Sequence, residues 1–120
     1  MATININLVQ HFSDCPGGRY RANGEFSGEA FREDHLRPAL ADPANTVTID
    51  MNHAFTIPPS FLDEAFGILV EEMGEQKFRS RVLVVINDDP AAEMEYEDVI
   101  EKHSRRSRPS GFLRRRREYA

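Results

Sequence analysis

The chain has 120 residues, of which 40% are hydrophobic and 29% are charged, as is typical of one folded domain with its own core. The longest apolar run, residues 82–86, is too short to cross a bilayer, and no basic and apolar leader opens the chain. The single cysteine, Cys15, excludes an internal disulfide. We therefore expect a cytoplasmic protein that has no membrane segment.

The net charge of −5 is distributed unevenly along the chain. Residues 102–120 carry eight basic side chains and one acidic side chain, a net charge of +7, whereas residues 1–101 carry −12. Beyond Ser104 the sequence is also rich in Arg, Ser, Pro and Gly. We therefore predict a domain over residues 1–104 and a basic tail over residues 105–120.

The first part of the chain shows two strand patterns and one helix pattern. Residues 4–8 alternate apolar and polar side chains, which predicts a half-buried strand. Residues 19–22 predict a second, short strand after a Pro-Gly-Gly turn. Ser27 is a suitable N-cap for a helix that runs to about Leu40, which Pro38 would bend or shorten.

The second part begins with a strand over residues 47–51 and the clearest helix of the chain, over residues 60–73. Apolar side chains recur along that helix at helical spacing, and its outer face carries the acidic residues Asp63, Glu64, Glu71 and Glu72. Residues 81–86 form an apolar, β-branched run that predicts a central strand covered on both faces. Asp89 and Pro90 open a last helix that continues through His103.

The order of these elements indicates the fold class. Strand–helix–strand repetition with an apolar strand predicts an α/β fold, in which helices pack against a mostly parallel sheet with right-handed crossovers. We expect a single domain of this kind.

Several short blocks of the sequence follow a known pattern. They are residues 16–19, residues 24–28 followed by Phe31, the pair Ile49-Asp50, and residues 59–67, of which residues 60–67 are the most specific. Over about residues 3–90 the chain resembles the STAS-like domain family of unknown function. That family is named for its similarity to the STAS domain of sulphate transporters and anti-sigma-factor antagonists. The basic tail lies outside the resemblance.

The resemblance implies a STAS-type fold and a protein-binding module of a bacterial or phage-encoded system. The implied partner is a histidine-kinase-like ATPase, which phosphorylates a Ser or Thr at the start of the helix that follows the strand ending near Asp50. This chain departs from the antagonists at that helix start, because Pro58 stands at the aspartate and Pro59 at the phosphoacceptor. Ser60, at the second hydroxyl position, is the remaining candidate for phosphorylation.

Two interpretations of Ser60 are open. A phosphate on Ser60 would meet free backbone N–H groups and the positive end of the helix dipole. Alternatively, the Ser60 hydroxyl caps the helix with Asp63 as its capping-box partner, and Asp63 and Glu64 repel a phosphate. We favour the cap, and the helix start remains a docking surface in either case.

The loop over residues 53–60 brings apolar and stiff residues together just before the helix. Such a loop either packs under the domain or forms a contact patch, and two adjacent prolines lower the entropy cost of docking. We predict a partner-binding surface on loop 53–60 and helix 60–73. Its residues are Phe55, Ile57, Pro58, Pro59, Ser60, Phe61, Asp63 and Glu64.

Glycines and arginines ahead of the first helix form a second candidate site. Gly17, Gly18, Arg19 and Arg21 have the composition of an anion cradle for a nucleotide or a partner's carboxylate. A β-turn with solvated arginines explains the same residues equally well. The segment lacks the Lys-Ser/Thr of a P-loop and the spaced glycines of a dinucleotide site.

The residues show no catalytic or metal-binding pattern. Cys15 has no second cysteine, and the four histidines are scattered without metal-ligand spacing. We therefore expect no metal, no cofactor and no enzymatic activity.

The basic tail supports a second hypothesis, that of a nucleic-acid-associated protein. Its arginines would bind phosphates, dock on an acidic partner, fold back on the acidic body or simply solubilise the chain. Phe112 and Leu113, between two basic runs, offer an apolar anchor. The arginines concerned are Arg105, Arg106, Arg108, Arg114, Arg115, Arg116 and Arg117. The first hypothesis is a non-enzymatic protein-interaction module of STAS-like type, and the sequence leaves the oligomeric state open.

Overall fold

A computed structural model describes residues 2–107. Its sheet has three parallel strands in the order β1 (Thr3–Asn7), β2 (Thr46–Asp50) and β3 (Val82–Val85). The register places Ile4 beside Val47, and Val47 beside Val82. The predicted α/β fold with a parallel sheet is therefore confirmed.

Within the described residues, the long helices cover one face of the sheet. Ile6, Val47, Ile49 and Val82 point to the covered face and are buried, whereas Leu83, on the opposite face of β3, is 59% exposed. The segment over residues 81–86 was expected to be a central strand covered on both faces, and this is wrong. β3 is an edge strand, and β2 occupies the centre.

The predicted strand over residues 19–22 is also absent from the described chain. After β1, α1 (Leu8–His11) forms one turn, and Arg21–Asn23 forms a 3₁₀ turn. The Asn23 side chain accepts a hydrogen bond from the Tyr20 N–H at 3.0 Å, which closes this turn locally. The Arg21 N–H donates to the Glu29 carboxylate at 2.9 Å and the Arg19 carbonyl accepts from the Glu29 N–H at 2.9 Å, so these backbone groups are not available to the sheet.

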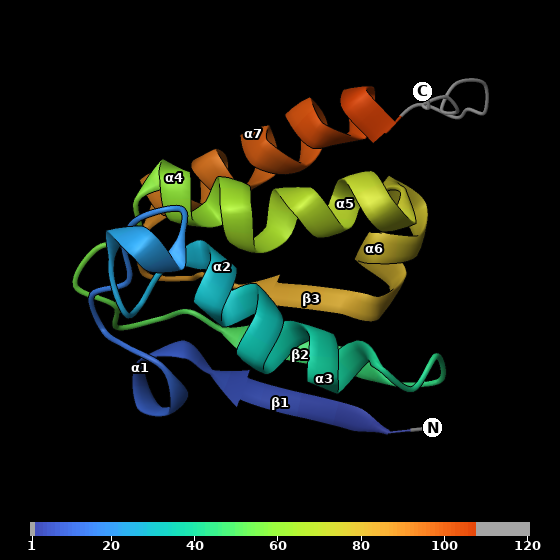
Figure 1. The fold of residues 1–120 in the computed structure, drawn as a ribbon, viewed down its shortest axis with the longest axis horizontal. Helices are drawn as coiled ribbons and strands as arrows, with labels where there is room; N and C mark the ends of the chain where they lie inside the picture. The colour runs from blue at the N-terminus through green and yellow to red at the C-terminus, as the bar shows by residue number, and fades with distance from the viewer. Residues whose placement is uncertain (1, 108–120) are drawn as a thin grey trace.

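The first long helix comprises α2 (Gly28–Phe31), a π-helical turn (Arg32–Leu36) and α3 (Arg37–Leu40). Ser27 is its N-cap, as predicted, because its hydroxyl accepts a hydrogen bond from the Ala30 N–H at 3.1 Å. Pro38 does not end the helix. Arg37 donates its N–H to the Arg32 carbonyl, five residues back, and Pro38, which has no N–H to donate, follows this wide turn. Figure 1 shows α2 and α3 passing in front of β2.

The second long helix comprises α4 (Pro59–Leu62), a π-helical turn (Asp63–Gly67) and α5 (Ile68–Met73). Gly74 ends it with a φ of 84°, and α6 (Glu75–Arg81) follows at once. The sequence did not predict α6, because Phe78 is its one buried apolar residue and no periodic pattern marks it.

The last helix, α7 (Pro90–Ser107), begins as predicted, since the Asp89 carboxylate accepts a hydrogen bond from the Ala92 N–H at 3.1 Å. It continues three residues beyond Ser104, where the tail was predicted to begin. Within residues 2–107, no helix combines the length and the apolar character needed to cross a membrane.

The core lies between the sheet and the helices. The Phe66 ring is at its centre, with centroids 5.4 Å from Tyr96 of α7 and 6.4 Å from Phe78 of α6. Phe31 packs on the other side of Phe66 at 6.1 Å. One aromatic cluster thus joins all the long helices, which fixes their order across the sheet.

Two glycines permit the long helices to approach one another closely. A Cβ on Gly28 of α2 would lie 2.7 Å from the Phe61 carbonyl oxygen and 2.9 Å from the Ala65 nitrogen, both backbone atoms. A Cβ on Gly67 would overlap the ring of His103 in α7. Both positions therefore require glycine for steric reasons.

We expect Gly28→Ala and Gly67→Ala each to lower the free energy of unfolding by about 1–3 kcal/mol. Inside a helix the same change ordinarily stabilises a protein, so a decrease in the free energy of unfolding would itself indicate the steric overlap. Gly17→Ala is the matched control, because a Cβ at Gly17 would have no neighbouring atom within 4 Å and the φ of Gly17 is not positive. Urea unfolding of the three variants measures the difference. Unchanged or increased stability of Gly28→Ala would contradict the close approach of the helices.

Candidate functional site

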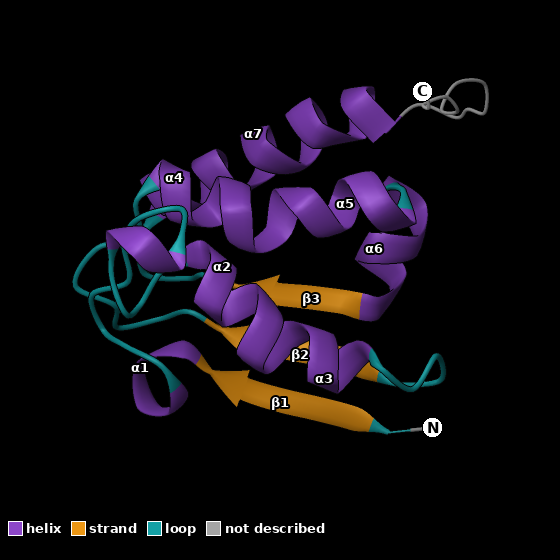
Figure 2. Cartoon of the chain, viewed as in Figure 1, coloured by secondary structure: helices purple, strands orange, loops and turns teal. Residues whose placement is uncertain are grey.

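The loops that follow the three strands gather at one end of the molecule. Figure 2 shows them at the end to which the strand arrows point. Hydrogen bonds tie them together: Phe55 donates its N–H to the Asp14 carbonyl at 2.6 Å, and His53 donates its N–H to the Asp88 carboxylate at 2.8 Å. The Asn52 side-chain oxygen accepts a hydrogen bond from the Asn87 N–H at 2.6 Å. The loop over residues 53–60 is therefore held by both neighbouring loops.

The structure divides the predicted partner-binding residues into two groups. Phe55 is 84% exposed, Pro59 is exposed, and Pro58 and Ser60 are half-buried. These four residues form the accessible part of the set, which we call the Phe55 surface. The other four, Ile57, Phe61, Asp63 and Glu64, are each at most 8% exposed, so they are not part of the accessible surface.

The predicted cap at Ser60 is wrong. The helix begins one residue earlier, at Pro59, and Pro58 occupies the N-cap position. Phe61 and Leu62 donate their N–H groups to the Pro58 carbonyl at 3.1 and 3.3 Å. Proline at the first helical position needs no N–H partner, which explains the early start. Phosphorylation of Ser60 stays a prediction.

The expected outer position of Asp63 and Glu64 is also wrong. Asp63 is 7% exposed and Glu64 is 8% exposed, because α2 covers one side of their helix and α7 covers the other. Asp63 accepts hydrogen bonds or ion pairs from Arg19 at 2.8 Å, His103 at 2.8 Å and Lys102 at 2.9 Å. One buried carboxylate thus connects the loop after α1, α7 and the second long helix, which lies between α2 and α7 and is called the central helix below.

His103 completes this cluster and is only 3% exposed. Its Nε2 faces Asp63, and its Nδ1 makes a short contact with the Glu71 carboxylate. Both ring nitrogens are occupied by carboxylates of this chain. His103 is therefore not placed to act as a general base toward an outside molecule.

The electrostatics of Asp63 reflect competing effects. Burial acts to raise the pKa of its carboxyl group, but the hydrogen bonds from Lys102, His103 and Arg19 together outweigh burial. They hold the pKa of Asp63 well below its usual range. Asp63 is consequently a fixed negative charge in the folded protein.

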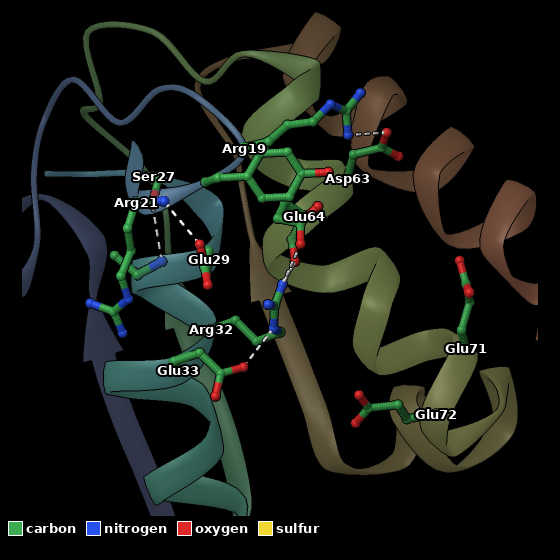
Figure 3. Close-up of polar contacts among 12 residues, drawn as sticks. Arg19, Arg21, Ser27, Glu29, Arg32, Glu33, Asp63, Glu64, Glu71 and Glu72 are labelled. Carbon is green, nitrogen blue, oxygen red and sulfur yellow. Dashed lines mark hydrogen bonds and ion pairs between the residues drawn. The ribbon is translucent and has the colours of Figure 1, made fainter. Parts of the chain in front are cut away.

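Arg32 forms a second buried connection, between the two long helices. It is 7% exposed and lies between the Glu64 carboxylate, at 3.0 Å, and the Glu33 carboxylate, at 2.9 Å (Figure 3). It also donates a short hydrogen bond to the Glu64 carbonyl. Arg37 extends the chain of ion pairs from Glu33 to Glu72. Sequence reasoning missed this network, because no spacing pattern relates Arg32 to Glu64.

The arginines of the predicted anion site are engaged by carboxylates. Arg19 pairs with Asp63, and Arg21 makes two hydrogen bonds to Asp34, at 2.8 and 3.1 Å. Gly17 donates its N–H to the Phe26 carbonyl, and the Gly18 carbonyl accepts a hydrogen bond from the Gly28 N–H. An external anion would therefore have to displace a carboxylate of this chain.

The predicted tail falls largely outside the described residues. Arg105 and Arg106 lie in the last turn of α7, where Arg105 faces Glu101 at 3.4 Å and Arg106 faces Glu71 at 3.7 Å. The other predicted tail arginines, Arg108 and Arg114, Arg115, Arg116 and Arg117, lie outside residues 2–107. Within those residues, no three His, Cys, Asp or Glu side chains are grouped to hold a metal ion.

Comparison with known protein families shows to which family the chain belongs. A family described as a STAS-like domain of unknown function matches residues 27–92, more than half of the chain. The chain belongs to this family. The match contains both close-contact glycines, Gly28 and Gly67, and both buried carboxylates, Asp63 and Glu64. Comparisons of the STAS-like chain with curated proteins and with solved structures found no match.

The extent of the match separates two parts of the STAS-like domain. It covers the two long helices, β2, β3 and the Phe55 surface, and it confirms the resemblance carried by residues 59–67. It does not cover β1 or the glycine–arginine segment with Gly17 and Arg19. The part shared with the family thus runs from the N-cap of the first long helix to the start of α7.

We expect Asp63→Asn to lower the free energy of unfolding at pH 7 by about 2–3 kcal/mol. This is less than for a fully buried pair, because Arg19 and Lys102 are 42% and 43% exposed. Urea unfolding of both proteins between pH 2.5 and 7 measures the difference.

The pH dependence has a definite sign. The pKa of Asp63 is lower in the folded than in the unfolded protein. The contribution of the ionised Asp63 to the free energy of unfolding is therefore present above about pH 4 and decreases as the pH falls further. The stability difference between wild type and Asp63→Asn should therefore shrink below about pH 4. A difference that stays constant down to pH 2.5 would refute the assignment.

Proposed function

We propose that this STAS-like domain is a non-enzymatic, regulatory protein-interaction module that docks to a protein partner through the Phe55 surface. The single observation that carries the proposal is the 84% exposure of Phe55 in a loop whose backbone is fixed on both sides. A large aromatic side chain on a fixed loop offers apolar area that a partner gains free energy by burying. The STAS resemblance suggests a histidine-kinase-like ATPase as the class of partner.

The rigidity of the Phe55 surface supports the proposal. Pro58 and Pro59 restrict the backbone beside Phe55, and the Phe55 N–H is bonded to the Asp14 carbonyl. A surface fixed before binding loses less conformational entropy when it docks. Its underside, Ile57 and Phe61, is packed in the core, so the surface is continuous with the rigid part of the domain.

Phe55→Ser should lower the affinity for a partner captured from the native cells by about 10-fold or more, as truncation of a central aromatic anchor does. Met94→Ser is the matched control, since Met94 is 68% exposed and lies on α7. It should leave the affinity within about twofold. Quantitative affinity capture with each purified variant measures both effects. Equal capture by Phe55→Ser and wild type would refute the proposed surface.

A nucleic-acid-associated function is the alternative, and the +7 charge of residues 102–120 favours it. Deleting residues 108–120 tests it without shortening α7, which ends at Ser107. Under this alternative, the deletion strongly reduces retention on DNA or RNA at ~0.1 M salt, and the slope of log affinity against log salt falls by about 4 to 5 for the five arginines removed. Absence of retention by the full chain would refute the alternative. Capture of a protein partner should be unaffected by the deletion.

A further inference from the structure

A pocket of about 310 Å³ lies at the end of the molecule opposite the Phe55 surface. Its lining residues come from the end of α3, the end of α5 and α6, and these segments lie in Figure 1 at the end away from the loops that follow the strands. Its volume is at the lower end of the range of small-molecule sites. Its walls include three cations, Arg37, Lys77 and Arg81, and one carboxylate, Glu72.

The charges of this pocket are unusual within the acidic body. Residues 2–107 contain ten Lys and Arg side chains, and eight of them have a carboxylate within 4.0 Å. The two that have none in this part of the chain are Lys77 and Arg81. Both line the same pocket. Since residues 1–101 carry a net charge of −12, this is a concentration of unneutralised positive charge where carboxylates are abundant.

The cations are held in position. Arg81 donates to the Asn45, Leu40 and Asp42 carbonyls at 3.0, 3.2 and 2.7 Å, and these neutral acceptors fix its guanidinium without cancelling its charge. Arg37 is fixed by two hydrogen bonds to Glu72, at 2.9 and 2.8 Å. Three cations and one carboxylate leave the pocket with a net charge of +2. Such an arrangement favours an oxyanion.

The rest of the pocket wall is apolar. Leu69 is 2% exposed and Leu40 and Met73 are partly buried, so the cations stand beside a hydrophobic floor. We propose that this pocket binds a small carboxylate or phosphate that carries a short apolar group. The oxyanion contacts Lys77 and Arg81, and the apolar group lies against Leu40, Leu69 and Met73.

The test is a titration of the ¹⁵N-labelled full chain, followed by amide chemical shifts. Hexanoate and hexyl phosphate are the probes, and hexanol, acetate and inorganic phosphate are the comparators. We expect shifts concentrated in α6 and the ends of α3 and α5, with dissociation constants on the order of 1 mM. Hexanol, acetate and inorganic phosphate should each bind at least about 5-fold more weakly. Hexanol lacks the oxyanion, and acetate and inorganic phosphate lack the longer apolar chain. Tighter binding of hexyl phosphate or of hexanoate distinguishes a phosphate site from a carboxylate site, and either result supports the proposal.

Lys77→Gln tests the role of the unneutralised charge and should weaken binding by about 10-fold. Arg79→Gln is the matched control, because it removes the same charge from the same helix at a residue paired with Glu75 and Glu97. It should change the affinity by less than about twofold. Equal weakening in the two variants, shifts spread over the whole domain, or equal binding of hexanol would each overturn the proposal. If a variant is unstable, the series of probes on the wild-type chain still tests whether the pocket recognises both the oxyanion and the apolar group.

Discussion

The carboxylate of Asp63 is the interaction on which the arrangement of the helices depends. It lies in the second turn of the central helix, is almost buried, and is reached by Arg19 from the loop after α1 and by Lys102 and His103 from α7. Burying a single charge is costly, and it is tolerated because three donors surround it. The geometry is directional, so the three segments have one arrangement that satisfies Asp63. The hydrophobic contacts of the core are not directional, so they constrain the helices less sharply than these ion pairs do.

Close approach of the helices is the second requirement of this arrangement, and it explains in physical terms why glycine occupies two positions of the matched region. Gly28 sits against the backbone of the central helix, and Gly67 sits beneath the His103 ring. Without these glycines, α2 and α7 would stand farther from Asp63 and its neighbour Glu64. The ion pairs and the glycines thus act together. Short hydrogen-bonding distances at Asp63 are possible because small residues bring the backbones close.

Much of the fold follows from local patterns, but the network does not. Alternation in β1 and the Ser27 and Asp89 caps predicted where elements begin, because these signals depend on neighbours in sequence. Asp63 resembled a solvent-facing residue because its partners Arg19 and His103 are 44 and 40 residues away. Likewise, β3 is apolar enough for a central strand, and only the strand order shows that it is at the edge. The loop over residues 53–60 precedes the second long helix as predicted, whereas its division into exposed and buried residues depends on tertiary packing.

The parallel sheet has a consequence for how the chain folds. Thr3 pairs with Thr46, and Val47 pairs with Val82, so each strand meets its neighbour only after an intervening stretch of some 35 to 43 residues has been ordered. Hairpin formation cannot start the process, because adjacent strands are not joined by tight turns. Such long-range pairing slows folding relative to a bundle of similar size. During synthesis, β1 emerges before β2, which leaves the edge of β1 accessible to other chains in the interval.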